Sequence, residues 1–406
     1  MSRETKLIGD IGTTYPGLSG KTKDDFAHGD AMYITFLNVL NNPVIDTSIF
    51  EKVDVKAGEK QNRCRKGDLF FNTSSETPEE VGMCAYLAEE IPSLYLNSFC
   101  FGFHIKDADV DGQYLSYYFR GKDGRKLMTM LAQGATRYNL SKENFMASEI
   151  ELPVKEEQSR IASALFDIDT LICDLDRTIE KKQNIRQGAM EQLLSGKKRL
   201  PGFKGEWIEM KVSEIGKLSG AGVDKKSNPD EVPVRLVNFL DVYHRSRIAN
   251  SELHHWVTAT PEKVQSCNVK RGDIFFTPSS EMPDDIGQSA VAVEDMENVC
   301  YSYHIYRLRP FIELDPDYGA YAFQNKYFFD QVKVESEGSG KRYVVSLNKF
   351  KELYALLPPT VEEQQAIAST LTAMDDEIAM LQLERTKYAN IRSGMMDDLL
   401  SGTKRL

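Results

Sequence analysis

Two short polar segments recur in this chain, and the first carries hydroxyl groups that could bind an anion or a base edge. FFNTSSE at 70–76 returns as FFTPSSE at 275–281, and the phenylalanines are typical of a buried strand. Serine and threonine hydroxyls hydrogen-bond to phosphate oxygens and to base edges of nucleic acids. The same serine and glutamate could instead cap a following helix, and the sequence leaves both interpretations open. The candidate contact residues are Thr73, Ser74, Ser75, Thr277, Ser279 and Ser280.

The second recurring segment places arginine and tyrosine behind small residues. GATRY at 134–138 corresponds to GSGKRY at 338–343. A loop of small residues allows a phosphate to approach the backbone, and an arginine can bind a phosphate or read guanine through two hydrogen bonds. An arginine that is merely solvated is the alternative. The candidate residues are Arg137, Tyr138, Lys341, Arg342 and Tyr343.

No residue pattern in the chain indicates catalysis or metal binding. The six histidines do not cluster with carboxylates at ligand spacing, and the glycine-rich Ser219–Gly222 lacks the lysine of a phosphate-binding loop. His104 and His304 precede Ile105 and Ile305, and we expect them to occupy matching places, either half-buried on a strand or in contact with a base. We therefore predict no catalytic residue and no metal site.

Composition and charge restrict the class of protein. The net charge of −11 argues mildly against nucleic-acid binding, but the acidic residues are densest in 156–196 and 362–403. The globular parts can still present a local basic face, which decides DNA affinity more than the total does. No apolar run reaches the roughly 18 residues of a membrane helix. Six cysteines without C-x-x-C spacing, and an N-terminus without a signal-peptide core, predict a cytoplasmic protein with reduced thiols.

The polar segments belong to a repeat that spans the whole chain. KGDLFFNTSSETPEEVGMCA from Lys66 matches RGDIFFTPSSEMPDDIGQSA from Arg271, a shift of 205 residues. EEQSRIASALFDID from Glu156 matches EEQQAIASTLTAMD from Glu362, a shift of 206. The repeating unit is therefore a module of about 200 residues, longer than a solenoid repeat. Two such modules can fold back with approximate two-fold symmetry, which suits duplex DNA with two half-sites.

Each module begins with a mixed α+β domain, predicted at 1–152 and 201–357. Aromatic and β-branched runs predict strands, and mixed apolar and charged runs predict one helix in each domain. Leu-Pro pairs at 152–153 and 357–358 end the two domains, because proline disfavours helix in the residue before it. The predicted strands are 33–39, 68–72, 97–105, 234–240, 273–277 and 299–308, and the predicted helices are 113–132 and 318–332.

Each domain is followed by a long helix with an apolar seam, predicted within 153–200 and 358–406. Apolar residues alternate at steps of four and three, which is the heptad pattern of a coiled coil. The seam could serve only for dimerisation, but two helices of matched length within one chain most simply pair with each other, antiparallel. The seam residues are Ile161, Leu165, Ile168, Ile172, Leu175, Ile179, Ile367, Leu371, Met374, Ile378 and Leu381.

These motifs, in this order, resemble the specificity subunit of type I restriction–modification systems. The resemblance rests on the GDL/I-F-F strand in each half, the Leu-Pro followed by EEQ-x-x-IA, the heptad helix and LLSGKKRLPGF at 193–203. It covers essentially the whole chain. It implies an α+β fold with two similar target-recognition domains separated by two long antiparallel coiled-coil helices, a pseudo-two-fold tandem repeat.

The resemblance also implies a function and a set of partners. Each domain would read one half of a split double-stranded DNA target, and the helices would fix the distance between the half-sites. Two modification subunits would transfer methyl from S-adenosylmethionine to adenine N6, and two restriction subunits would use ATP and Mg²⁺. The chain itself would need no cofactor, catalyse no reaction and contact no membrane. A coiled-coil scaffold whose globular ends bind peptides or proteins is the alternative, and an enzyme with an unfamiliar site is a third.

Overall fold

A computed structural model describes residues 3–406, which divide into two compact units. The first unit comprises Met1–Asp176 with Leu383–Leu406, and the second comprises Arg177–Gln382. Each unit therefore contains one globular domain together with a segment of each long helix.

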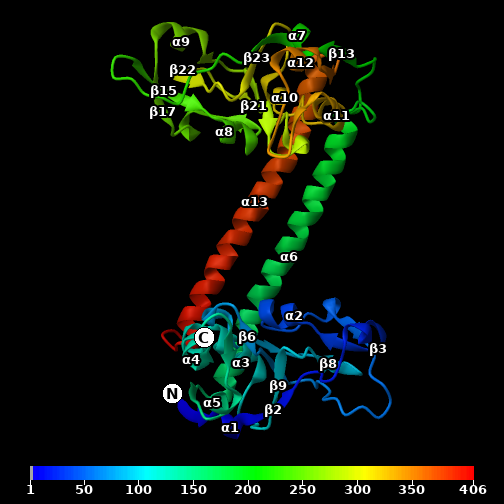
Figure 1. Cartoon of the computed structure of the whole chain (residues 1–406), viewed down its shortest axis with the longest axis vertical. Helices are drawn as coiled ribbons and strands as arrows, with labels where there is room; N and C mark the ends of the chain where they lie inside the picture. The colour runs from blue at the N-terminus through cyan, green and yellow to red at the C-terminus, as the bar shows by residue number, and fades with distance from the viewer. Residues whose placement is uncertain (1–2) are drawn as a thin grey trace. The chain divides into compact units, whose positions relative to one another are not determined.

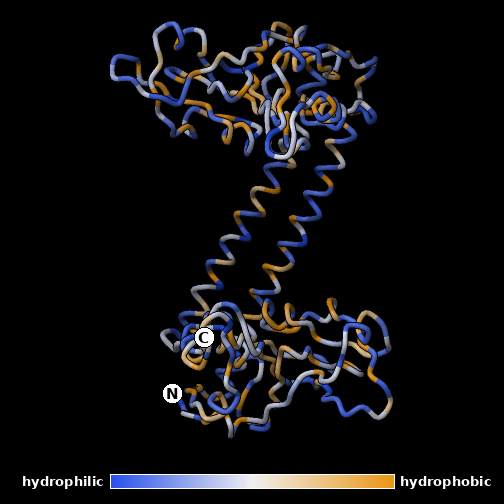
Figure 2. The backbone as a smooth tube through the Cα atoms, in the orientation of Figure 1, coloured by the Kyte–Doolittle hydropathy of each residue, from blue (hydrophilic) through white to orange (hydrophobic). Residues whose placement is uncertain are grey.

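The two long helices are the longest elements of the chain (Figure 1). Helix α6 covers Lys155–Leu193 and helix α13 covers Val361–Leu400, within the segments that the heptad pattern predicted. Each begins after its Leu-Pro pair, with two glutamates in its first turn, where the helix dipole favours negative charge. Hydrophobic and hydrophilic residues alternate along both helices (Figure 2).

The first domain is built from small, mainly antiparallel sheets. Its recurring strand β5 lies between β9 and β7 in the largest of these sheets. In order of pairing, the sheets are β1 (Glu4–Leu7) with β12 (Glu149–Leu152); β2 (Gly12–Pro16), β9 (Cys100–Ile105), β5 (Leu69–Asn72) and β7 (Cys84–Tyr86); β4 (Glu51–Val53), β3 (Phe26–Ile34) and β8 (Leu94–Leu96); and β10 (Ala132–Gln133), β11 (Tyr138–Leu140) and β6 (Ser74–Ser75). The helices are α1 (Ile8–Ile11), α2 (Phe36–Asn41), α3 (Gly112–Arg120), α4 (Lys122–Leu131) and α5 (Lys142–Met146), with 3-10 turns at Lys23–Asp25, Thr47–Ile49 and Pro78–Glu80.

The second domain repeats this plan with one more strand in each of the two larger sheets. Its sheets are β13 (Ile208–Lys211) with β26 (Tyr354–Leu357); β14 (Gly216–Ser219), β23 (Tyr306–Pro310), β19 (Ile274–Phe276), β21 (Ser289–Ala292) and β16 (Arg247–Ile248); β17 (Trp256–Ala259), β15 (Val232–Val237), β22 (Met296–Tyr301) and β18 (Asn268–Val269); and β20 (Ser279–Ser280), β25 (Arg342–Val344) and β24 (Glu337–Ser339). The helices are α7 (Val212–Ile215), α8 (Phe239–Tyr243), α9 (Pro261–Ser266), α10 (Pro316–Gly319), α11 (Lys326–Glu335) and α12 (Leu347–Glu352), with 3-10 turns at Asn250–Glu252 and Pro283–Asp285.

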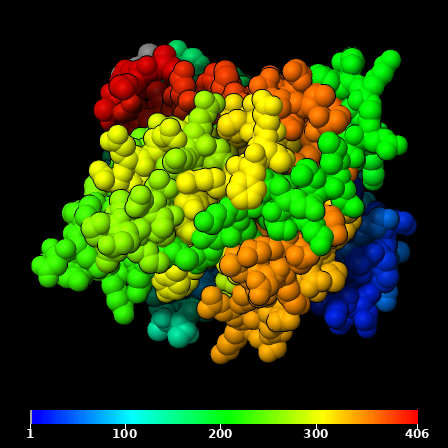
Figure 3. All heavy atoms as spheres, turned by 90° about the horizontal axis from the view of Figure 1, so that it is seen from above, coloured from blue at the N-terminus to red at the C-terminus, as the bar shows by residue number. Residues whose placement is uncertain are grey.

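The strand register shows that the two domains are equivalent residue by residue. Leu69 of β5 faces Phe103 of β9, and 205 residues later Ile274 of β19 faces Leu308 of β23. In both domains the first strand pairs with the last, so segments far apart in the sequence become neighbours. Figure 3 shows this in the second unit, where green and orange atoms lie side by side as the β13–β26 pairing requires. The prediction of two similar α+β domains in tandem is confirmed.

The cores of the domains explain why each long helix belongs to both units. The core of the first domain buries Ile161 and Leu165 from the start of α6 together with Leu399 and Leu400 from the end of α13. The core of the second domain is built the same way, with the roles of the helices exchanged. It buries Ile367, Ala368 and Leu371 from the start of α13 and Met190 and Leu193 from the end of α6, together with Leu194 directly after it.

Ion pairs show that the helix segments run antiparallel within each unit. In the first unit Arg385 binds Asp176 (3.0 Å) and Arg392 binds Asp169. In the second unit Lys182 binds Glu377 (2.6 Å) and Arg186 binds Asp375. In each case one position rises along the sequence while its partner falls, so the predicted antiparallel pairing is confirmed.

Several predicted elements differ from the structure. The run 33–39 was expected to be one strand, but β3 ends at Ile34 and α2 follows, because the Thr35 hydroxyl accepts a hydrogen bond from Asn38 N and starts a helix. The run 234–240 is divided in the same way by Asn238, whose backbone N–H is capped by Asp241.

Three further predictions joined elements that the structure separates. The run 299–308 contains a turn between β22 and β23, the helix at 113–132 breaks between α3 and α4 at Gly121, and the helix at 318–332 is interrupted between α10 and α11. Gly121 is both the C-cap of α3 and the N-cap of α4, and its extended backbone (φ −81°, ψ 173°) separates the two helices. None of the helices within residues 3–406 is long and apolar enough to cross a membrane.

Candidate functional site

The two recurring polar segments meet in one small sheet of each domain. In the first domain β6 pairs with β11, with Ser75 opposite Tyr138. In the second domain β20 pairs with β25, with Ser280 opposite Tyr343. Both pairings sit 205 residues apart, so the hydroxyl segment and the arginine segment form one site in each domain. We call the β10–β11 and β24–β25 hairpins, with the serines of β6 and β20, the hairpin surface.

A glycine at a fixed position shapes each hairpin. Gly134 and Gly338 have φ values of +138° and +146°, and a Cβ atom on either would come within 2.1 Å of the carbonyl oxygen of Arg137 or Arg342. Only glycine fits such a backbone, because a side chain would be strained and would collide with the opposite strand. The hairpin tip is thereby closed tightly beneath the arginine.

The basic side chains of the hairpin surface are exposed. Arg137, Lys341 and Arg342 all face solvent, and Arg342 Nη2 lies 3.4 Å from the Ser279 hydroxyl. Among residues 3–406, the Arg137 guanidinium and the Lys341 ammonium have no hydrogen-bond or ion-pair partner within the chain. Cations held out from a surface in this way suit an anionic partner.

The hydroxyl candidates differ in how far a partner could reach them. Ser75, Ser279, Ser280 and Thr73 are half-buried. Thr277 is fully buried and its hydroxyl accepts a hydrogen bond from Gln288 N, so it supports the loop rather than facing a ligand. Ser74 is buried as well, and we leave both out of the proposed contact set.

The capping alternative and the two tyrosines can also be placed. The 3-10 turn Pro78–Glu80 follows the hydroxyl segment, but its N-terminus has no side-chain cap, and Ser75 instead donates to Glu80 at 2.8 Å. Tyr138 and Tyr343 pack partly against their domain cores. The two tyrosines therefore anchor the hairpins to the domain cores, and the arginines are the principal exposed groups of the hairpin surface.

The second domain brings further basic groups to the hairpin surface that the motifs did not single out. Burial lowers the pKa of His304, and the positive charges of Lys225 and Arg342 lower it further, while Asp224 opposes them. Lys225 arrives there because Gly222 packs against the backbone of Ser302, where a Cβ would come within 2.4 Å. The run of small residues before Lys225 was the available signal for this approach.

In the first domain the equivalent positions carry different side chains. Phe99 stands where the second domain has His304, and each follows a turn in which a side-chain oxygen accepts its backbone N–H, from Asn97 and Ser302 respectively. Phe99 is 56% exposed, and its carbonyl accepts a hydrogen bond from Thr73 N (2.9 Å). The two hairpin surfaces thus share an arginine but differ in the groups beside it.

The expected match between His104 and His304 is wrong. The strand register shows that the residue of the second domain equivalent to His104 is Arg309, not His304. His104 Nδ1 lies 2.8 Å from buried Asp68, and Arg309 Nη2 lies 2.5 Å from buried Asp273. The aspartate of the recurring Gly-Asp is therefore a structural carboxylate. Its partner is a histidine in one domain and an arginine in the other, so matching the two histidines by residue type gave the wrong pair.

The helix-seam candidates are all buried or half-buried. Those near the helix starts pack into the domain cores, as described for Ile161 and Leu371, so these positions do more than pair helices. The heptad seam along the intervening turns stays a prediction. Buried are Ile161, Leu165, Ile168, Ile179, Ile367, Leu371 and Ile378, and half-buried are Ile172, Leu175, Met374 and Leu381.

The chemistry available at the hairpin surface is binding. Exposed guanidinium and ammonium groups beside hydroxyls can hold phosphates and hydrogen-bond to base edges. Within residues 3–406 no group of histidine, cysteine or carboxylate side chains is arranged to hold a metal ion. The cysteines in this part of the chain form no disulfide.

Comparison with known proteins points to a single family. A family model described as the type I restriction modification DNA specificity domain matches residues 3–185 and again residues 204–391. The type I restriction enzyme MjaVIII specificity subunit of Methanocaldococcus jannaschii is 24% identical over 324 residues, covering 74% of this chain and 72% of that protein. A putative MjaX specificity subunit from the same organism is 26% identical over 310 residues, covering 73% and 69%.

Solved structures share the fold. The S subunit of a type I restriction–modification system from M. genitalium matches with a TM-score of 0.57 at 14% identity, covering 98% of this chain and 96% of that one. A chain from a study of complex assembly and conformational transition of the type I R-M system matches with a TM-score of 0.55 at 14% identity, covering 98% and 97%. Because the family model matches both halves and most of its length, the chain belongs to the type I restriction–modification DNA specificity family, whose members are non-catalytic DNA-recognition subunits.

Proposed function

We propose that each domain reads one half of a split duplex target through its hairpin surface. The observation that carries this proposal is that one arginine recurs at equivalent places in both domains, beside a tyrosine that lies opposite a serine of the hydroxyl segment. Arg137 and Arg342 would hold the DNA backbone or a guanine edge. Phe99 in one domain and His304 with Lys225 in the other would make the half-sites differ.

We further propose the partners that the resemblance implies. Two modification subunits carrying S-adenosylmethionine would methylate adenine, and two restriction subunits would supply ATP- and Mg²⁺-dependent activity. This chain would contribute no cofactor and would act in the cytoplasm, where unpaired cysteines such as Cys64 and Cys267 persist.

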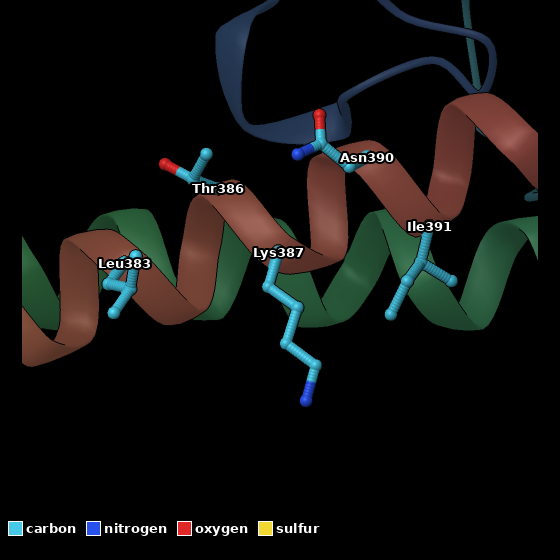
Figure 4. A pocket seen from close by; sticks show the side chains of 5 residues that line it. All are labelled: Leu383, Thr386, Lys387, Asn390 and Ile391. Atoms are coloured by element: carbon cyan, nitrogen blue, oxygen red, sulfur yellow. The ribbon is translucent and has the colours of Figure 1, made fainter.

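A surface on α13 suits one of these partners. Leu383 and Ile391 are 73% and 41% exposed, and with Thr386, Lys387 and Asn390 they line a shallow hollow of about 490 Å³ (Figure 4). Exposed leucine and isoleucine on one helix mark a protein contact more often than a DNA contact. We assign this hollow to a modification subunit, and Leu383→Glu should reduce co-purification of that subunit.

DNA binding by the full chain with its modification subunit tests the proposal. The target is first read from the positions methylated in cells that carry both proteins. Affinity for that duplex should fall steeply with salt, because phosphate contacts release counterions. Inserting one base pair into the gap should weaken binding, since it moves a half-site by about 3.4 Å and by about a tenth of a turn. Equal binding at every gap length would refute the role of the helices as a spacer. No response to DNA, with partner affinity that does not depend on salt, would favour the protein-scaffold alternative.

A further inference from the structure

Three side chains join the first domain to both long helices. The hydroxyl of Tyr117 on α3 donates to Asp169 Oδ2 on α6 at 2.9 Å. Asp169 also accepts hydrogen bonds from Arg392 on α13, through Nε and, at 3.4 Å, through Nη2. One carboxylate thus binds a donor from the domain and a donor from the second helix. We call this set, and its counterpart in the second unit, the clamp.

The second unit contains the same clamp with the helices exchanged. The hydroxyl of Tyr321 donates to Asp375 Oδ2 on α13 at 2.7 Å. Asp375 accepts from Arg186 on α6, through Nε and, at 3.4 Å, through Nη2. Asp169 and Asp375 are 206 residues apart, as are Arg186 and Arg392, so each helix supplies the carboxylate to one clamp and the guanidinium to the other.

The clamp differs from the other contacts between domain and helices. Hydrogen bonds such as that from Ser159 to Asp111 (2.7 Å) join the domain to one helix, whereas the clamp joins it to both. Apolar packing, which buries Ile161 and Leu399 in the first core, is non-directional and tolerates rotation. Hydrogen bonds to a charged carboxylate are directional and strong. Tyr117 and Tyr321 are fully buried, so their hydroxyls require a partner at a fixed place. A rotation of the domain on its helices would therefore strain this bond.

We propose that the two clamps are positioning devices that fix the angle of each domain on its helix pair and thereby sharpen the choice of gap length between the half-sites. The inference rests on the proposed function, because gap length matters only if both domains read one duplex. A domain that could tilt would also reach a half-site displaced by one base pair. The preference for one gap length would then be lost, while affinity for the natural target would be largely kept.

The second clamp has an additional contact beside it that the first clamp lacks. In the second unit Arg247 donates to Thr372 on α13 at 2.7 Å, and its guanidinium lies 5.1 Å from the centre of the Tyr321 ring. In the first unit Val44 occupies the place of Arg247, since Val44 bridges to Tyr86 as Arg247 pairs with Val291. The first clamp therefore lacks this additional support, and variants there should have the larger effect.

The test compares gap selectivity in variants of the first clamp. Tyr117→Phe removes only the hydroxyl and keeps the buried ring, and Asp169→Asn weakens both arms. The matched control is Asp176→Asn, which breaks a salt bridge from α6 to Arg385 on α13 without involving a domain residue. Each full chain, with its modification subunit, is titrated with duplexes of the natural gap and of one base pair more or fewer.

We expect the ratio of affinities for the natural and altered gaps to fall roughly fivefold in Tyr117→Phe, about the effect of one buried hydrogen bond. Asp176→Asn should keep the wild-type ratio, and Tyr321→Phe should lose less than Tyr117→Phe. A Tyr117→Phe complex as selective as wild type would overturn the inference, even if Asp169→Asn proved too unstable to purify. A wild-type complex without gap preference would instead refute the proposed function, and the clamp inference with it.

Discussion

Arg342 Nη2 lies 3.4 Å from the hydroxyl of Ser279, a residue 63 positions earlier in the chain. The contact unites the two recurring polar segments, and the strand pairing that produces it is repeated by Ser75 and Tyr138 in the first domain. A guanidinium held against a hydroxyl, with its remaining donors facing solvent, is oriented before any ligand arrives, which reduces the entropy lost on binding.

Replacing either hairpin arginine should weaken DNA binding in a way that reveals what it contacts. Arg137→Ala or Arg342→Ala should cost about 1–3 kcal/mol and relax preference at one base pair if the arginine reads a base edge. If it binds a phosphate, affinity should fall for all sequences and the salt slope should decrease by about one. Titrations at several salt concentrations, with targets mutated one base pair at a time, distinguish these results.

The matched controls for these variants are Arg65→Ala and Arg271→Ala. Arg65 lies in the domain of Arg137 and Arg271 in the domain of Arg342, and both residues are exposed. Their substitution by alanine removes the same charge as the hairpin variants do. They precede β5 and β19, whereas the hairpin surface follows these strands. Controls that weaken binding as much as Arg137→Ala and Arg342→Ala would show that net charge, not the hairpin, determines affinity.

DNA binding should be coupled to protonation of His304. Its free pKa lies below the ordinary value through burial and the charges of Lys225 and Arg342, with Asp224 acting in the opposite direction. A phosphate bound beside these groups would raise the pKa, so the complex would take up a proton. The added affinity is complete below the free pKa and is lost as pH rises through the bound pKa. The gain should be roughly tenfold if DNA raises the pKa by one unit.

Binding measured between pH 5 and 8 checks this coupling, with His304→Asn as the variant that should abolish it. His28→Asn, at an exposed position on β3, should leave the pH dependence unchanged. An identical pH profile for His304→Asn and the wild type would show that no phosphate binds beside His304.

Much of the fold could be predicted because the repeat is strong and the helix periodicity is local. The heptad spacing identified α6 and α13, and the aromatic runs identified β5 and β19, since both patterns depend on residues close together in sequence. The strand ends at Ile34 and Val237 were missed because Thr35 and Asn238 act as helix caps inside apolar runs. Local capping there outweighed strand propensity.

The candidate site was predictable only in part. Arginine and hydroxyl motifs could be found by their recurrence, but their pairing joins strands far apart in sequence, and no local pattern encodes such contacts. Burial of Thr277 depends on how its loop folds over Gln288, which the sequence does not reveal. The equivalence of His104 and Arg309 shows that matching positions in the two domains need not carry the same residue type.

Substituting the hairpin glycine should disable the second domain's hairpin surface. Gly338→Ala would put a Cβ atom within 2.1 Å of the Arg342 carbonyl, with φ at +146°, and should destabilise the hairpin by about 1–3 kcal/mol. Gly340→Ala is the control, because its φ of +62° carries left-handed backbone strain as well, but no heavy atom lies within 4 Å of the added Cβ atom. DNA affinity should fall more for the first variant than for the second, because only the first adds a collision to the strain, and equal losses would contradict the role assigned to Gly338.

The end of α13 should stabilise the domain that begins the chain. Leu399 is buried in the core of the first domain, and Arg3 Nη2 donates to the Leu400 carbonyl at 2.6 Å. Leu399→Ala should therefore lower the free energy of unfolding of the first unit by about 2–5 kcal/mol, the usual cost of a large-to-small change in a core. Leu383→Ala, on the same helix but 73% exposed, should cost much less. Hydrogen exchange should show the lost protection in β1 and β12 rather than in the second domain, although the second domain directly precedes α13. Loss of protection confined to the second domain would mean that the helix end does not belong to the first core.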